Sequence, residues 1–111
     1  MDMVVPKRFE VWLLNLDPTV GSEIKKTRPC VVISPDELNE SKLQTVIVAP
    51  MTTTIKPYPT RIALTFESKK GQIALEQLRA IDKSRLKKRL GVLKTKEKKA
   101  ILSRLSELFS E

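Results

Sequence analysis

Residues 60–81 read TRIALTFESKKGQIALEQLRAI, and this stretch decides the fold class. In residues 60–66 every second side chain is apolar, which predicts a β-strand with one buried face. The alternation resumes in residues 73–81, after the turn residues ESKKGQ, where Gly71 can adopt a positive φ. We expect these two strands to pair as a hairpin, so the chain should build an antiparallel sheet.

Three further strands are predicted upstream of this hairpin. FEVWLLNL, residues 9–16, is rich in the aromatic and branched residues that favour strands. CVVIS, residues 30–34, and TVIVAPM, residues 45–51, are short apolar runs typical of buried strands. We expect Pro50 to stop or kink the second run, because proline cannot donate to a strand ladder. PDELNES, residues 35–41, predicts a turn or a short helical loop.

The end of the chain predicts a last strand and one helix. Asp82 can cap a short helical turn at DKSRL, and KRLGVL, residues 88–93, favours a further strand. Thr95 can cap a helix with one apolar stripe, which comprises Ile101, Leu102, Leu105, Leu108 and Phe109. Five or six short strands with a single terminal helix indicate one mainly β domain over residues 1–111, built as a bent antiparallel sheet or small barrel.

The charge of the chain favours phosphate-bearing or acidic partners. Lysine and arginine number 21 against 13 aspartate and glutamate residues, which gives a formal net charge of +8. The basic C-terminal third, KSRLKKRL followed by KTKEKK, indicates either a nucleic-acid patch or a solvated helical face. With one Trp, one Tyr and three Phe, the chain has too few aromatic side chains for a general single-strand stacking platform.

Several functional classes are excluded by residues that the chain lacks or holds only once. Without histidine, a Ser-His triad and the usual zinc sites are excluded. Cys30 is the single cysteine and lies in an apolar run, so we expect a buried structural thiol in a reducing compartment. The first ten residues, MDMVVPKRFE, lack the pattern of a signal peptide, and no apolar run is long enough to span a membrane. A cytoplasmic location is therefore expected.

A long polar connection, DPTVGSEIKKTRPC, occupies residues 17–30 between two apolar runs. Long loops in compact domains usually carry function. Pro29 restricts Arg28 to an extended backbone, so the guanidinium should leave from the start of a rigid strand. Arg28 is therefore a candidate anion-binding group. The alternatives are a plain surface cation or an ion pair with Glu23.

Two more polar clusters lie near predicted strand ends. Thr52, Thr53 and Thr54 follow a strand, where hydroxyl groups can bind a phosphate or cap a turn. In LEQLR, residues 75–79, polar side chains break the pattern expected of a buried face. A functional cleft is one cause of such a break.

Taken in order, these blocks resemble a known family. VWLLNLDPTVGSEIKKTRPCVVIS, VAPMTT with YPTR, and LEQLRAIDKSRL are similar to the MazF/PemK toxins of bacterial toxin–antitoxin pairs, which are sequence-specific endoribonucleases. The likeness extends from near Lys7 to the final helix. It implies a small SH3-like antiparallel barrel of the MazF/PemK/CcdB type, a homodimer and a cognate antitoxin. It also implies cleavage of single-stranded RNA, mRNA included, without metal or another cofactor, which inhibits translation and growth.

The resemblance also implies roles for single residues. Arg28 and Thr52 fall on the family's catalytic pair. Glu23 falls on its loop glutamate, and Glu76 falls on the acidic residue of its [DE]-Q block. One departure is Phe9, where many members carry glycine. The candidate RNA contacts are basic and polar side chains of the loops and the LEQLR block, namely Lys25, Lys26, Thr27, Thr53, Thr60, Arg61, Gln77 and Arg79.

This chemistry does not require histidine. RNA supplies its own nucleophile, the ribose 2′-hydroxyl, so the protein has to align the attack and stabilise charge on the phosphoryl oxygens. Arg28 stays protonated and can bind two oxygens, while Thr52 can donate a hydrogen bond to the same phosphate. The expected products end in a 2′,3′-cyclic phosphate and a 5′-hydroxyl. Glu23, Glu76 or the loop backbone could assist proton transfer, and the sequence does not choose among them.

Two other functions fit the same pattern. The same barrel serves CcdB-like toxins, which trap DNA gyrase through their C-terminal residues, and a basic barrel could bind RNA without cleaving it. The presence of Arg28 and Thr52 favours the endoribonuclease. The antitoxin of so basic a toxin is expected to be an acidic, partly disordered peptide that folds on binding and occludes the RNA groove.

Overall fold

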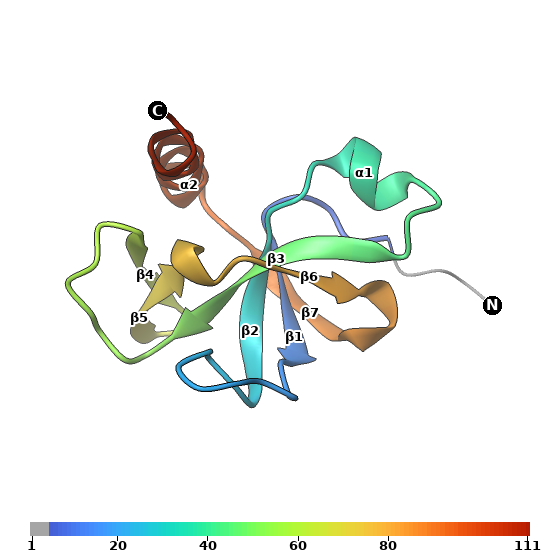
Figure 1. Ribbon diagram of the computed structural model, residues 1–111, viewed down its shortest axis with the longest axis horizontal. Coiled ribbons are helices and arrows are strands. Elements are labelled where there is room, and N and C mark those ends of the chain that lie inside the picture. Colours follow the sequence, from blue (N-terminus) through green and yellow to red (C-terminus); the bar gives the residue numbers. More distant parts are fainter. Residues whose placement is uncertain (1–4) are drawn as a thin grey trace.

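The computed structural model of the chain describes residues 5–111 (Figure 1). The part of the signal-peptide prediction that concerns residues 1–4 lies outside them. The strands are β1 (Glu10–Asn15), β2 (Thr27–Val32), β3 (Thr45–Thr52), β4 (Arg61–Phe66), β5 (Lys69–Ala74), β6 (Arg79–Asp82) and β7 (Leu86–Val92). The helices are α1 (Asp36–Glu40), α2 (Thr95–Leu108) and the single 3-10 turns η1 (Leu75–Gln77) and η2 (Lys83–Arg85).

All these strands pair antiparallel in one curled sheet of order β4-β5-β3-β2-β1-β7, and β6 pairs with the first half of β3. β3 crosses the middle of the molecule and links its two halves (Figure 1). The curl brings the end strands β4 and β7 close to each other. A Cβ added to Gly91 in β7 would lie only 3.6 Å from the Phe66 ring of β4. This curled half-barrel confirms the predicted mainly β, antiparallel fold.

The central strands β2 and β3 contribute to buried clusters on both of their faces, although Ile47 in the first half of β3 is exposed. Cys30 and Val32 of β2 lie in one apolar cluster, whereas Val31 and Ile33 lie in a second cluster that also contains Ile101 of α2. A strand covered on both faces has no position for an exposed polar residue, so its sequence is a continuous apolar run. This double burial explains why CVVIS and TVIVAPM show no alternation.

Two local predictions for the strands were wrong. The strand end predicted at Pro50 is absent, since β3 continues to Thr52, whereas the alternative of a kink there stays a prediction. Pro50 lies where β3 passes from β6 to β5, and a missing amide costs little in that gap. The hairpin of β4 and β5 is confirmed, but its turn consists only of Glu67 and Ser68, with φ of 49° and 64°. Gly71 therefore lies within β5 and not in the turn.

Two further predictions also need correction, one for the strand expected at residues 73–81 and one for the start of the last helix. The expected strand 73–81 is interrupted by η1, which turns the LEQ segment out of the sheet. Lys94, not Thr95, is the N-cap of α2, and no side chain caps this helix. Of the predicted stripe, Ile101 is buried and Leu105 packs against the core. Its other members, Leu102, Leu108 and Phe109, are exposed. Within residues 5–111 no helix has both the length and the apolar character to cross a membrane.

Candidate active site

Arg28 and Thr52 lie on neighbouring strands and face the same cleft. β2 and β3 pair through Cys30 and Pro50, and two further residues along each strand lead to Arg28 and Thr52. In an antiparallel register this step keeps both side chains on one face of the sheet. The predicted pair is therefore brought together by the fold.

Each member of the pair keeps donor groups free for a ligand. The half-buried Arg28 uses its Nε to donate to the Lys25 carbonyl at 2.7 Å, and no described residue binds its two terminal nitrogens. Thr52 is 7% exposed, and its Oγ1 accepts a hydrogen bond from the Thr54 amide at 3.1 Å. Among residues 5–111 nothing accepts the Thr52 hydroxyl hydrogen. Together they present a cation and an O–H donor.

The pair lines a cleft of about 500 Å³ between the β1–β2 loop (residues 16–26) and η1. We call it the loop cleft. Seven of the residues predicted for the site line it, namely Glu23, Lys25, Arg28, Thr52, Arg61, Glu76 and Gln77. They come from the loop and from four separate elements, so the sheet register and the loop conformation together assemble this cleft.

The Glu76 carboxylate is held in place by its neighbours. Thr60 donates to Oε1 at 2.7 Å, and Arg61 approaches Oε2 with Nε and Nη2, each at 2.7 Å. Burial raises the pKa of Glu76, but the hydrogen bonds from Arg61 and Thr60 outweigh burial and the pKa lies below its ordinary value. Glu76 is therefore ionised at neutral pH and a weak proton acceptor.

The same network occupies Arg61. Its side chain is only 6% exposed, and besides its bonds to Glu76 it donates through Nη1 to the Gln72 side-chain oxygen at 3.2 Å. Gln72 is itself buried and holds the Lys56 backbone through two hydrogen bonds of 3.0 and 3.1 Å. A direct contact between Arg61 and RNA stays a prediction, since the guanidinium is already paired.

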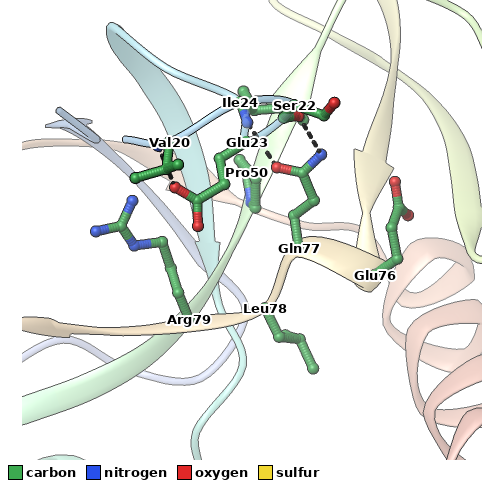
Figure 2. Close-up of a pocket in the computed structure, with 9 residues that line it drawn as sticks. All are labelled: Val20, Ser22, Glu23, Ile24, Pro50, Glu76, Gln77, Leu78 and Arg79. Carbon is green, nitrogen blue, oxygen red and sulfur yellow. Dashed lines mark hydrogen bonds between the residues drawn. The ribbon is translucent and has the colours of Figure 1, made fainter. Parts of the chain in front are cut away.

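Glu23 differs from Glu76 in its surroundings. It lies in the β1–β2 loop, is exposed, and accepts one hydrogen bond on Oε1 from the Val20 amide at 2.6 Å. Its second oxygen has no partner in the described part of the chain. Figure 2 shows this carboxylate beside the Arg79 guanidinium in a pocket of about 400 Å³ that adjoins the loop cleft.

Side chains from the other half of the chain anchor the β1–β2 loop. Arg79 donates to the Leu16 carbonyl at 2.9 Å, and Arg85 donates to the Asp17 carbonyl at 2.7 Å. Gln77 binds the middle of the loop, where it contacts backbone groups of Ser22 and Ile24 (Figure 2). The long polar connection is thus a loop docked against η1 and β6.

A second cleft, of about 300 Å³, meets the loop cleft at Arg28 and Thr52. We call it the hairpin cleft, because the β4–β5 hairpin forms one of its walls. Its lining includes the predicted residues Thr27 and Thr53 as well as Lys69, Lys70 and Phe66, which sequence reasoning missed. These three residues lie in the predicted hairpin, so the hairpin prediction could have indicated them as candidates. Of the remaining predicted RNA contacts, Arg79 lines the pocket of Figure 2, and Lys26 and Thr60 line neither cleft.

The single thiol is fully buried, as the sequence predicted. Burial raises the pKa of Cys30 to about 12, although Arg79, Arg28 and Arg85 act in the opposite direction. Cys30 is therefore a protonated, unreactive core residue. Residues 5–111 contain no group of three or more carboxylate or thiol side chains placed to hold a metal ion.

Comparison with known proteins places the chain in a family. Residues 7–109 match the PemK-like, MazF-like toxin of type II toxin-antitoxin system. The chain is 38% identical over 101 residues to the Endoribonuclease MazF of Staphylococcus saprophyticus, with 86% of this chain and 83% of that protein covered. It is 34% identical over 94 residues to the Endoribonuclease MazF9 of Mycobacterium tuberculosis, with 77% and 80% covered.

A solved structure agrees with this match. The crystal structure of MazF (Form-I) from Deinococcus radiodurans superposes with a TM-score of 0.81 at 25% identity, covering 95% of this chain and 96% of that chain. By sequence and by fold, the chain belongs to the PemK-like, MazF-like toxin family, as its motifs predicted.

Proposed function

We propose that this protein is a sequence-specific endoribonuclease toxin that cleaves single-stranded RNA, mRNA included, and that residues 1–111 form one toxin domain. The observation that carries the proposal is the position of Arg28 and Thr52 at the junction of the two clefts. Two relatives that are more than 30% identical are named endoribonucleases, and the family is described as toxins, which supports the assignment.

The proposed reaction uses the RNA as its own nucleophile. The ribose 2′-oxygen forms a bond to phosphorus while the bond from phosphorus to the 5′-oxygen breaks, which leaves a 2′,3′-cyclic phosphate and a 5′-hydroxyl. The 2′-hydroxyl loses one proton and the 5′-oxygen gains one. The free terminal nitrogens of Arg28 bind the phosphoryl oxygens, and Thr52 donates to the same phosphate. No metal takes part in this reaction.

For the proton transfer we favour Glu23 over Glu76. Both carboxylates line the loop cleft, but the Glu76 oxygens accept hydrogen bonds from Thr60 and Arg61, and its pKa is lowered. Glu23 keeps one oxygen without a partner in the described part of the chain. A lowered pKa makes a carboxylate a less efficient base at a given working pH. Glu76 then acts by holding Arg61 and the cleft wall.

The cellular role follows from cleavage of mRNA. We propose that the protein acts in the cytoplasm as a homodimer, inhibits translation and growth, and is neutralised by a cognate antitoxin. The family description as part of a toxin–antitoxin system supports that partner. The net charge of +8 favours an acidic peptide.

The proposal is tested with purified protein and one long RNA. We expect Arg28→Ala to lower the single-turnover cleavage rate by about 10² to 10⁴, the range for removal of a preorganised charge stabiliser. Thr52→Val removes one hydrogen bond to a charged group and should cost about tenfold to a hundredfold. Lys87→Ala, which removes an exposed charge from β7, is the control and should cleave like wild type. EDTA should not change the rate, and the new 5′ ends should accept phosphate from a kinase without prior dephosphorylation.

Several results would contradict the proposal. Wild-type cleavage by Arg28→Ala would remove Arg28 from the reaction. RNA that stays intact while DNA gyrase is trapped would indicate a CcdB-like toxin. RNA that is bound with a steep salt dependence but never cut would indicate a binding barrel.

A further inference from the structure

The Gln77 side chain hydrogen-bonds the backbone of the β1–β2 loop in the way that a neighbouring strand would. The Ile24 amide donates to its Oε1 at 2.6 Å, and its Nε2 donates to the Ser22 carbonyl at 3.4 Å. These bonds join positions 53 and 55 residues apart in the sequence, and both are visible in Figure 2. One amide group thus satisfies a donor and an acceptor of alternate loop residues, as a neighbouring strand would.

This contact leads directly to Arg28. Lys25 follows Ile24 in the loop, and its carbonyl accepts the Arg28 Nε hydrogen bond at 2.7 Å. The loop position therefore fixes the carbonyl, and the carbonyl fixes the plane of the guanidinium. With Nε held in this way, the two terminal nitrogens stay available for a phosphate in the clefts that Arg28 lines.

The Gln77 hydrogen bonds and the packing of the Ile24 side chain against the buried cluster that contains Leu14 and Val48 hold the middle of the loop. Within the described chain, side chains of other elements hydrogen-bond residues 18–25 only through Gln77 and Arg28. Arg79 and Arg85 bind the loop at its base, at Leu16 and Asp17. Loss of the Gln77 amide would thus remove the hydrogen bonds that fix the backbone next to the Lys25 carbonyl, while the Ile24 packing and the hydrogen bonds at the base of the loop remain.

We infer that Gln77 is a positioning residue, which docks the β1–β2 loop so that the Lys25 carbonyl orients Arg28 for phosphate binding. The inference rests on the proposed RNA cleavage. The amide oxygen and nitrogen of Gln77 each make one hydrogen bond to the loop, which leaves one N–H and one lone pair, so a contact between Gln77 and RNA stays a prediction beside this positioning role. In this role Gln77 acts on the reaction through Arg28.

The test compares Gln77→Leu with Gln44→Leu. Gln44 is an exposed glutamine with a local side-chain bond to Lys42, so it is a matched control. In the free protein we expect Gln77→Leu to raise hydrogen exchange of the Ile24 amide about tenfold or more, since the hydrogen bond is lost. The kcat should fall about tenfold to a hundredfold, as for a misplaced catalytic group, with the RNA cleavage sequence unchanged. In the Arg28→Ala background the same substitution should cost little further activity.

A second variant keeps the test decisive if Gln77→Leu folds poorly. Gln77→Glu retains an acceptor for the Ile24 amide, so exchange of that amide should stay nearer to wild type than in Gln77→Leu. A changed cleavage sequence with unchanged Ile24 exchange would overturn the inference and make Gln77 an RNA contact. An equal loss of activity with and without Arg28 would also overturn it. Failure of the proposed function is recognised separately, because wild-type protein would then leave RNA intact while the Ile24 exchange still reports on the loop.

Discussion

Phe9 holds a backbone conformation that a side chain disfavours. Its φ is 71°, in the left-handed region, which costs an L-residue roughly 1–2 kcal/mol. The ring offsets this cost by packing against the buried cluster around Val11, with Arg8 and Lys98 at 5.3 and 5.9 Å from the ring centre. Glycine would adopt this φ without strain but would leave the space of the ring empty. Phe9 therefore preserves the chain path into β1.

Gly71 fixes the position of Thr52. A Cβ at Gly71 would lie 2.6 Å from the Thr52 carbonyl oxygen and 3.4 Å from its carbonyl carbon, so a side chain there has to displace the backbone of β3. We expect Gly71→Ala to lower kcat about tenfold to a hundredfold, since a small misplacement of a catalytic group has that effect. Gly91→Ala is the matched control, because its Cβ would meet only the Phe66 ring at an ordinary 3.6 Å. Single-turnover cleavage and circular dichroism of both variants check this, and equal rates would show that the close approach is immaterial.

Among the elements, η1 is held in place by an ion pair whose strength depends on pH. The pKa of Glu76 is lowered in the fold, so its contribution to stability is fully present above its ordinary pKa of 4.5 and is lost as the pH falls through the lower, folded value. We expect Glu76→Gln to reduce the free energy of unfolding by up to about 1 kcal/mol near neutral pH, as for a partly exposed ion pair. The difference from wild type should shrink on acidification.

Urea unfolding over a series of pH values measures this difference. Glu37→Gln is the control, because Glu37 is an exposed carboxylate in the first turn of α1. Its difference from wild type should be small throughout. A Glu76→Gln difference that stays constant between neutral and acidic pH would show that the charge of Glu76 does not stabilise η1.

Elements that are marked by a run of apolar residues could be predicted from the sequence. Elements that depend on contacts with residues far away in the chain could not. The apolar runs of β2 and β3 identified both strands, because each is covered on two faces. The alternation that begins at Ile73 predicted a strand up to Ile81, although Glu76 and Gln77 break the pattern of a buried face. What turns them out of the sheet is tertiary: Glu76 meets Arg61, and Gln77 meets the loop.

At the site, too, some residues could be predicted from the sequence and some contacts could not. Arg28 and Thr52 could be named from motifs, and the register of β2 and β3 brings them together. The pairing that occupies Arg61, and the loop contacts of Gln77 and Arg79, join side chains to positions far away in the chain. A sequence pattern does not show such partners, so four predicted RNA contacts, Thr60 included, turn out to be bound within the protein.

At the scale of the whole molecule, the two clefts define a path for a nucleic-acid strand. The loop cleft and the hairpin cleft have Arg28 and Thr52 in common, so a strand whose phosphate binds this pair extends into both. The lining of the hairpin cleft includes the two lysines Lys69 and Lys70 and a single carboxylate, that of Glu67. The net charge of +8 attracts RNA to the whole surface, and these two lysines give the path a local excess of positive charge.

This path predicts which lysines contribute to the salt dependence of RNA binding. Each phosphate contact to a single strand contributes about 0.7 to the slope of log affinity against log salt, so replacing Lys69 and Lys70 by alanine should lower the slope by about 1.4. Replacement of Lys87 and Lys88 removes the same charge from β7, outside both clefts, and should leave the slope near that of wild type. The probe is a short RNA with a 2′-deoxyribose at the mapped cleavage site, which binds but cannot react. Equal slopes for the two double variants would mean that RNA is held by the overall charge and that the hairpin cleft is not part of its path.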